Sequence, residues 1–158
     1  MSKFSLIAMG GTFDIIHHGH ITLLSTAFDI SEKVIIGLTS DEFVQKKGKN
    51  PLHKYDERLK NLTSIIFKKF PNSYFEISQL NNDFGPAVFE KEVQALVVSD
   101  ETKNQGNVLN KLRTEGNLSP VEIIVVPMTL AKDGKRISTT RIKNSEIDSD
   151  GNLLPIDK

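Results

Sequence analysis

The segment from Gly10 to His20 contains the residues of this chain that are best suited to chemistry. Gly10 and Gly11 follow an apolar stretch, and His17 and His20 stand directly before a helix-like segment. Glycines let a phosphate group approach the backbone closely, and a helix N-terminus adds N–H groups and the positive end of its dipole. Histidine side chains add polar donors beside such a cradle. This combination predicts a site for the α-phosphate of a nucleotide.

Five residues of this segment have expected roles at the phosphates. We expect His20 to donate to the α-phosphate as negative charge builds up there, and His17 to contact the same nucleotide on its β-phosphate side. Thr12 and Phe13 are expected to contribute backbone N–H groups, and Thr12 a hydroxyl as well. Gly19 is expected to leave room for the nucleotide between the two histidines.

Two further polar residues of the segment are interpreted structurally. Asp14 carries a short carboxylate of the kind that holds loops through hydrogen bonds to nearby backbone, and this role competes with a catalytic one. His18 is interpreted as a solvent-exposed side chain with no role at the site.

Near the end of the chain, a run of hydroxyl residues stands among cations. Ser138 is suited to cap a helix. Two more hydroxyls and three cations surround it: Thr139, Thr140, Lys135, Arg136 and Arg141. Capping alone would explain one serine, but the positive charge around the same helix end favours a site for the β- and γ-phosphates. Arg136 is equally compatible with a solvated loop.

A basic run, Lys46, Lys47 and Lys49, follows the second expected strand. Charge runs are often solvated faces, because charged side chains are rarely buried without a partner. The residue types alone leave a solvated face and a phosphate-binding loop as equal alternatives.

Composition excludes several classes of function. The 158 residues include no cysteine, which excludes disulfides, thiolate catalysis and cysteine-based zinc sites. The net charge is zero, so no general attraction to nucleic acid is expected. No apolar run approaches the ~20 residues that a membrane helix needs, and the N-terminus lacks a signal-peptide core. We therefore expect a cytoplasmic protein with no nucleic-acid or membrane partner.

Apolar runs alternate with helix-like stretches along the chain. The expected strands are short, mostly apolar and often β-branched: Phe4–Met9, Lys33–Leu38, Tyr74–Ser78, Ala95–Ser99 and Val121–Val126. The expected helices are His20–Ser31, Ser40–Lys47, Asp56–Phe70, Lys103–Glu115 and a short one from Ser138. Strands of this composition are typical of a parallel sheet that is buried on both faces.

This alternation predicts an α/β fold, a doubly wound, Rossmann-like five-stranded parallel sheet with helices on both faces. We expect a single domain over residues 1–158, with a loose tail over about 152–158. Ligands of such sheets bind at the carboxyl ends of the strands, at the topological switch point. The first strand is expected to end at Met9, which places the glycines and histidines of the first segment there.

Two motifs resemble the signatures of the nucleotidyltransferase superfamily, which also includes the class I aminoacyl-tRNA synthetases. The first is the G-G-T-F-D…H-x-G-H run of residues 10–20, and the second is Ile137–Ile142, which resembles an I-S-S-T-x-x-R motif at a helix start. Four further stretches resemble the archaeal-type phosphopantetheine adenylyltransferases: Gly37–Asp41, Val97–Thr102, Pro127–Gly134 and Glu146–Gly151. The resemblance extends over nearly the whole chain.

The resemblance implies roles for residues whose types alone decide little. One lysine of the basic run would enter the site and bridge the reacting phosphates, and the family's lysine-before-proline pattern points to Lys49, with Lys46 next. Arg58 matches the E-R pair that opens the third helix of the family, and an intrahelical ion pair is its alternative.

The loop after the fourth expected strand departs from the bacterial members of the family, which carry an arginine-rich loop there. This chain has Ser99, Asp100, Glu101 and Thr102 instead, as in the archaeal type. The resemblance implies that Ser99, Glu101 and Thr102 contact the nucleoside rather than the phosphates.

By this resemblance, the chain is expected to transfer AMP from ATP to 4′-phosphopantetheine, giving dephospho-coenzyme A and pyrophosphate. Mg²⁺ would be held largely by the ATP phosphates and water. The alternative acceptor is FMN, as in an FAD synthetase, and cytidylyltransferases and nicotinamide-mononucleotide adenylyltransferases carry the same two motifs. An ATP-sensing regulator without turnover is the alternative of a different class. The sequence leaves a homo-oligomer open.

Overall fold

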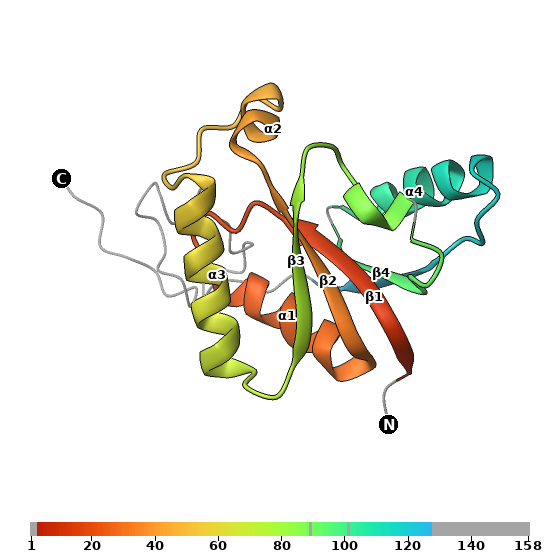
Figure 1. Cartoon of the computed structure of the whole chain (residues 1–158), viewed down its shortest axis with the longest axis horizontal. Helices are drawn as coiled ribbons and strands as arrows, with labels where there is room; N and C mark the ends of the chain where they lie inside the picture. The colour runs from red at the N-terminus through yellow and green to blue at the C-terminus, as the bar shows by residue number, and fades with distance from the viewer. Residues whose placement is uncertain (1–2, 89, 101, 128–158) are drawn as a thin grey trace.

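The computed structural model describes residues 3–88, 90–100 and 102–127. These residues form a five-stranded parallel sheet in the order β3-β2-β1-β4-β5 (Figure 1). The strands are β1 (Phe4–Gly11), β2 (Ser31–Thr39), β3 (Tyr74–Leu80), β4 (Ala95–Ser99) and β5 (Glu122–Val126). The helices are α1 (His18–Ile30), α2 (Asp41–Lys46), α3 (Tyr55–Lys69), α4 (Asn104–Glu115) and the 3₁₀ helix η1 (Gly85–Val88).

Alternate residues of the strands supply two hydrophobic cores, one on each face of the sheet. On one face, Leu24 of α1 and Leu62 of α3 pack with Ile7 and its neighbours. On the other face, Leu109 of α4 and Ala87 of η1 pack with Ala8 and its neighbours. Helices therefore cover both faces, and the predicted doubly wound α/β fold is confirmed.

The order of the strands places a switch point between β1 and β4. From β1 the chain moves outward through β2 and β3, then returns to the other side of β1 for β4 and β5. β1 pairs with β4 only at Ile7↔Ala95 and Ala8↔Leu96, although both strands continue beyond these pairs. The strands therefore separate at their carboxyl ends, where a crevice for a ligand is expected.

The observed elements match the predicted ones to within a few residues, and the differences have local causes. α1 begins at His18 rather than His20, because the side chain of His17 caps it. It ends at Ile30, and β2 already begins at Ser31, whose hydroxyl donates to the carbonyl of Lys33 at 2.7 Å. The predicted helix from Ser138 lies outside the described residues. No helix in the described part of the chain is long and apolar enough to cross a membrane.

A buried arginine fixes η1 against α4. The guanidinium of Arg113 donates to the carbonyls of Ala87 at 2.6 Å, Glu90 at 2.9 Å and Ser119 at 2.8 Å. Burial lowers the pKa of this guanidinium, which nevertheless remains charged at neutral pH. Arg113 thereby holds the segment of η1 that forms one wall of the crevice.

Candidate active site

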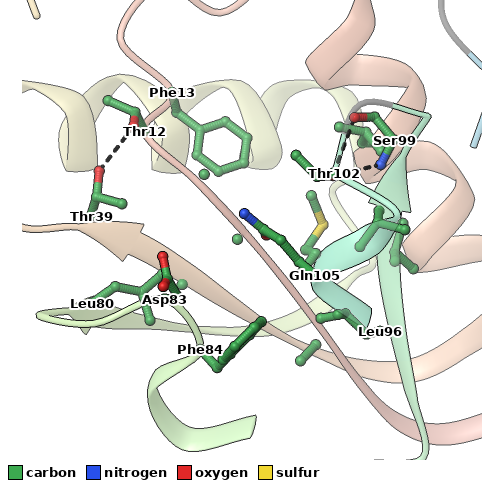
Figure 2. A pocket seen from close by; sticks show the side chains of 18 of the residues that line it. Thr12, Phe13, Thr39, Leu80, Asp83, Phe84, Leu96, Ser99, Thr102 and Gln105 are labelled. Carbon is green, nitrogen blue, oxygen red and sulfur yellow. Dashed lines mark hydrogen bonds between the residues drawn. The ribbon is translucent and has the colours of Figure 1, made fainter. Parts of the chain in front are cut away.

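A cavity of about 310 Å³ opens where β1 and β4 separate. Its walls come from the end of β1, the start of α1, the turn after α2, the segment that follows β3, and the end of β4 with the start of α4. Figure 2 shows the labelled part of this lining, with Thr12 and Phe13 opposite Leu80 and Phe84. The structure brings together the predicted residues Gly10, Gly11, Thr12, Phe13, His17, Gly19, His20, Lys49, Ser99 and Thr102.

The two histidines cap the start of α1 reciprocally. The backbone N–H of Gly19 donates to Nδ1 of His17 at 3.1 Å, and the backbone N–H of His17 donates to Nδ1 of His20 at 3.2 Å. A ring nitrogen that accepts a hydrogen bond carries no proton, so each neutral imidazole has its proton on Nε2. Both side chains line the cavity, with the ring proton of each on Nε2.

The imidazoles are also held by ring contacts. The rings of His17 and His20 stack with centroids 3.9 Å apart at an interplanar angle of 28°, and the Phe13 ring lies 4.9 Å from that of His20. Stacked rings at this distance would repel each other if both were cationic. The arrangement therefore favours neutral donors of fixed orientation, which act by hydrogen bonding.

The structure gives a further reason for glycine at position 19, besides the one predicted. A Cβ at this position would lie 2.9 Å from Cε1 and 3.0 Å from Nδ1 of the His17 ring. Real Cβ atoms do not approach this closely, so the His17 ring itself requires glycine here. Gly19 also lines the cavity, and the expectation that it leaves room for the nucleotide stays a prediction.

The end of β1 adopts an unusual backbone conformation. Phe13 has φ of 49°, a value that side-chain-bearing residues adopt rarely and at a cost of order 1–3 kcal/mol. Its side chain is 2% exposed. A Cβ at Gly11 would lie 3.1 Å from this ring, so glycine permits the close packing of Phe13. Strained residues of this kind are concentrated at functional sites.

Asp14 holds the loop that follows the basic run. Its carboxylate accepts from the backbone N–H of Leu52 at 2.9 Å and from that of His53 at 2.9 Å. The ring Nδ1 of His53 lies 3.1 Å from the same carboxylate. These contacts give Asp14 a structural role, but at a loop distant in sequence rather than at the nearby backbone that was expected. His18 is exposed, as predicted.

Arg58 is fully buried and connects four segments beneath the cavity. Nη1 donates to the carbonyls of Thr12 at 3.1 Å and Thr39 at 2.8 Å, and Nε donates to the carbonyl of His53 at 3.1 Å. Nη2 donates to Asp41 Oδ1 at 2.9 Å. The intrahelical ion pair is absent from these contacts, since the carboxylate partner of Arg58 is Asp41 on α2.

The pKa of Asp41 lies below its ordinary value of 3.8. Burial acts to raise this pKa, but the hydrogen bonds from Arg58 and from the backbone N–H of Tyr55 outweigh it. Asp41 is thus an anion at neutral pH and balances the charge of the buried Arg58.

Only part of the basic run lines the cavity. Lys47 and Lys49 line it, and Lys46 does not. Lys47 pairs with Asp83 at 2.7 Å, whereas no carboxylate of the described residues pairs with Lys49. Gly48 has φ of 76°, and this turn lets the N–H of Lys49 donate back to the carbonyl of Val44 at 3.1 Å. The turn therefore brings Lys49 to the cavity with its charge uncompensated by any carboxylate of the described residues.

Hydroxyl groups fix the backbone at two corners of the cavity. Thr39 Oγ1 donates to Thr12 Oγ1 at 3.1 Å, and Thr102 Oγ1 accepts from the N–H of Ser99 at 3.1 Å (Figure 2). Both contacts lie at strand ends. The predicted residues Glu101, Ser138, Thr139, Thr140 and Arg141 lie outside the described residues.

Sequence reasoning missed the apolar wall of the cavity and one polar residue. The wall is formed by residues at the end of β3, directly before η1 and within η1: Leu80, Phe84, Pro86 and Ala87. Gln105 of α4 points into the cavity (Figure 2). Only the apolar run after β3 signals this wall in the sequence, and packing explains that run equally well.

The described residues do not form a metal cage. No group of three metal-ligating side chains occurs among them, and Asp83, the one carboxylate in the described lining, is bound by Lys47. The donor set of the cavity is instead made of N–H groups and cations, which suit an anion.

The model of the cytidylyltransferase-like family matches residues 8–145, which include both histidines and every described part of the cavity from Ala8 onward. The chain belongs to the cytidylyltransferase-like family. Among its relatives, a phosphopantetheine adenylyltransferase from Pyrococcus horikoshii is 39% identical over 155 residues, which cover 98% of each chain. The resemblance to the archaeal-type phosphopantetheine adenylyltransferases is thereby confirmed.

Two further comparisons bear on the length and the fold of this cytidylyltransferase-like chain. A bifunctional phosphopantetheine adenylyltransferase/NTP phosphatase from Thermoplasma acidophilum is 41% identical over 149 residues, and the match spans 45% of that relative's length. The solved structure of a protein of unknown function from Archaeoglobus fulgidus has a TM-score of 0.70 and 27% identity, covering 78% of this chain and 89% of that one.

Proposed function

We propose that this chain is a pantetheine-phosphate adenylyltransferase, which transfers AMP from ATP to 4′-phosphopantetheine. The observation that carries the proposal is the reciprocal capping of His17 and His20, which fixes two imidazole rings in the lining of the cavity beside the end of β1. The choice of 4′-phosphopantetheine as the acceptor is based on the family membership and on the adenylyltransferase relatives.

The proposed reaction is an in-line displacement at the α-phosphorus. An oxygen of the acceptor phosphate forms the new P–O bond, and the bond from the α-phosphorus to the bridging oxygen breaks. Pyrophosphate leaves with that electron pair. The acceptor is already an anion, so no general base is required, and positioning with charge stabilisation does the work.

The described residues supply the groups that this displacement needs. His20 would donate from Nε2 to the α-phosphate, and His17 to the β-phosphate side. Lys49 would lie between the reacting phosphates, since its charge has no carboxylate partner among the described residues. Thr12 and Phe13 would hold the acceptor phosphate through backbone N–H groups and the Thr12 hydroxyl.

Other parts of the substrates are assigned from the sequence and the cavity lining. The segment Ser138–Arg141 would hold the β- and γ-phosphates, and Ser99 with Glu101 and Thr102 the nucleoside. The apolar wall formed by Leu80, Phe84, Pro86 and Ala87 suits the flexible arm of phosphopantetheine. Mg²⁺ would enter with ATP, because the described residues offer no cage for it.

The test is a pyrophosphate-release assay with ATP, Mg²⁺ and 4′-phosphopantetheine. We expect turnover by the wild type, and a kcat lower by roughly 10²–10⁴ for His20→Ala, the range for loss of one transition-state donor. Circular dichroism checks that the variant is folded. Wild-type ATP binding without turnover would favour the regulator alternative, and near-normal turnover by folded His20→Ala would refute the role of His20.

A further inference from the structure

We infer that Arg58 is a positioning residue of the proposed reaction, which holds the strained Thr12–Phe13 peptide in its phosphate-binding orientation. The inference rests on the proposed function for the identity of the reaction. The geometric part of the inference is independent of the proposed function, because it uses only the contacts of Arg58 and of the end of β1.

The first step concerns the peptide bond between Thr12 and Phe13. Its carbonyl accepts from Nη1 of Arg58 at 3.1 Å. A trans peptide is planar, so the N–H of Phe13 points opposite to that carbonyl and away from the buried Arg58. Within the described residues this N–H has no hydrogen-bond partner, although the Phe13 residue is only 2% exposed. A buried N–H without a partner is costly, and an anion in the cavity would satisfy it.

The second step concerns strain. Phe13 has φ of 49°, which persists only where surrounding contacts over-determine it. Two contacts do so here: its ring packs 4.9 Å from that of His20, and the carbonyl that precedes it is held by Arg58. Arg58 therefore preserves the orientation of this donor when no ligand is bound.

The third step concerns why the residue is arginine. The planar guanidinium donates in three directions at once: to the carbonyls of Thr12 and Thr39, to that of His53, and to Asp41. These partners belong to the ends of β1 and β2, to the loop before α3, and to the start of α2. A lysine ammonium is a compact donor and cannot span these four segments.

The experiment compares Arg58→Lys with Arg113→Lys in the full chain. Arg113 is the matched control, because it is also fully buried and also donates to backbone carbonyls, but on the other face of the sheet. We expect both variants to lose stability. Per folded enzyme, Arg58→Lys should lower kcat about 10- to 100-fold, with the KM for ATP within about threefold. Because Arg113 holds the η1 wall of the cavity, Arg113→Lys should raise the KM for 4′-phosphopantetheine, but at saturating substrates its kcat should stay within about threefold of wild type.

A second readout does not depend on turnover. In protein labelled with ¹⁵N-phenylalanine, titration with inorganic phosphate should shift the amide signal of Phe13 in the wild type and in Arg113→Lys. The shift should be lost in Arg58→Lys. If no acceptor supports turnover but this pattern holds, the proposed function fails and the role of Arg58 stands.

Two results would overturn the inference: a kcat per folded Arg58→Lys enzyme within about threefold of wild type, or an unchanged response of Phe13. If Arg58→Lys does not fold, Asp41→Asn replaces it, because it removes the negative charge of the one carboxylate that pairs with Arg58 among the described residues, and the Asp41 side chain is 44% exposed. This variant should weaken the Phe13 response and lower kcat several-fold, and an unaltered Phe13 response would overturn the inference equally.

Discussion

His17 and His20 hold each other in place across the first turn of α1. Each ring accepts a backbone N–H through Nδ1, that of Gly19 for His17 and that of His17 for His20. The same contacts that cap the helix also fix the tautomer, so that both rings are donors through Nε2. If the proposed function is right, the same two side chains perform both helix capping and phosphate recognition.

The two tasks of His17 can be separated by substitution. Asparagine is a good N-cap residue, so His17→Asn should keep most of the stability that His17→Ala loses, about 0.5–2 kcal/mol. Both variants lack the Nε2–H donor, and both should show similar losses of kcat/KM for ATP. Urea unfolding and pyrophosphate-release kinetics on the two variants test this. Wild-type kinetics in His17→Asn would show that the ring contributes to capping alone.

Gly19→Ala should damage activity without much loss of stability. Alanine improves helix propensity by up to about 1 kcal/mol over glycine, which offsets a weakened cap of similar size. The new Cβ would displace the His17 ring, since it would stand 2.9 Å from Cε1. We expect a kcat/KM lower by about 10- to 100-fold with a melting temperature close to wild type. Unchanged kinetics would mean that the ring can move aside freely.

Lys49→Ala and Lys46→Ala should behave differently, although the two lysines are three positions apart and both are exposed. Lys49 lines the cavity, so its removal should lower kcat by about 10²-fold or more, as for loss of one charged group at a developing charge. Lys46 lies outside the lining, so Lys46→Ala should leave kcat unchanged. Steady-state kinetics on the pair decides between a catalytic lysine and a solvated face, and two silent variants would establish the solvated face.

Acid should weaken the contact between Asp41 and Arg58. The pKa of Asp41 is lower in the folded protein than its ordinary value of 3.8, so ionised Asp41 stabilises the fold above that pH. This contribution is lost as the pH falls through the lower, folded pKa. The difference in unfolding free energy between wild type and Asp41→Asn should therefore be larger at pH 7 than at pH 3. Urea titrations at both values measure it, and a constant difference would contradict the ionic role.

The fold and half of the site were predictable because they depend on local patterns. The apolar runs indicate a buried parallel sheet. The spacing of the glycines and histidines in residues 10–20 predicts a phosphate site at the end of β1. The E-R pattern singled out Arg58, but its contacts were not predictable, because its partners Thr12, Thr39 and Asp41 are far from it in sequence. The requirement for Gly19 was also hidden, since it arises from the orientation of the His17 ring.

The acceptor is the part of the account that rests most on relatives, and the most direct test is a panel of acceptors. With ATP and Mg²⁺, pyrophosphate release should be rapid with 4′-phosphopantetheine and slight with FMN, nicotinamide mononucleotide or glycerol phosphate, and mass spectrometry should identify dephospho-coenzyme A. Rapid turnover with FMN and none with 4′-phosphopantetheine would contradict the proposed acceptor while leaving the displacement mechanism in place. No turnover with any acceptor would contradict both.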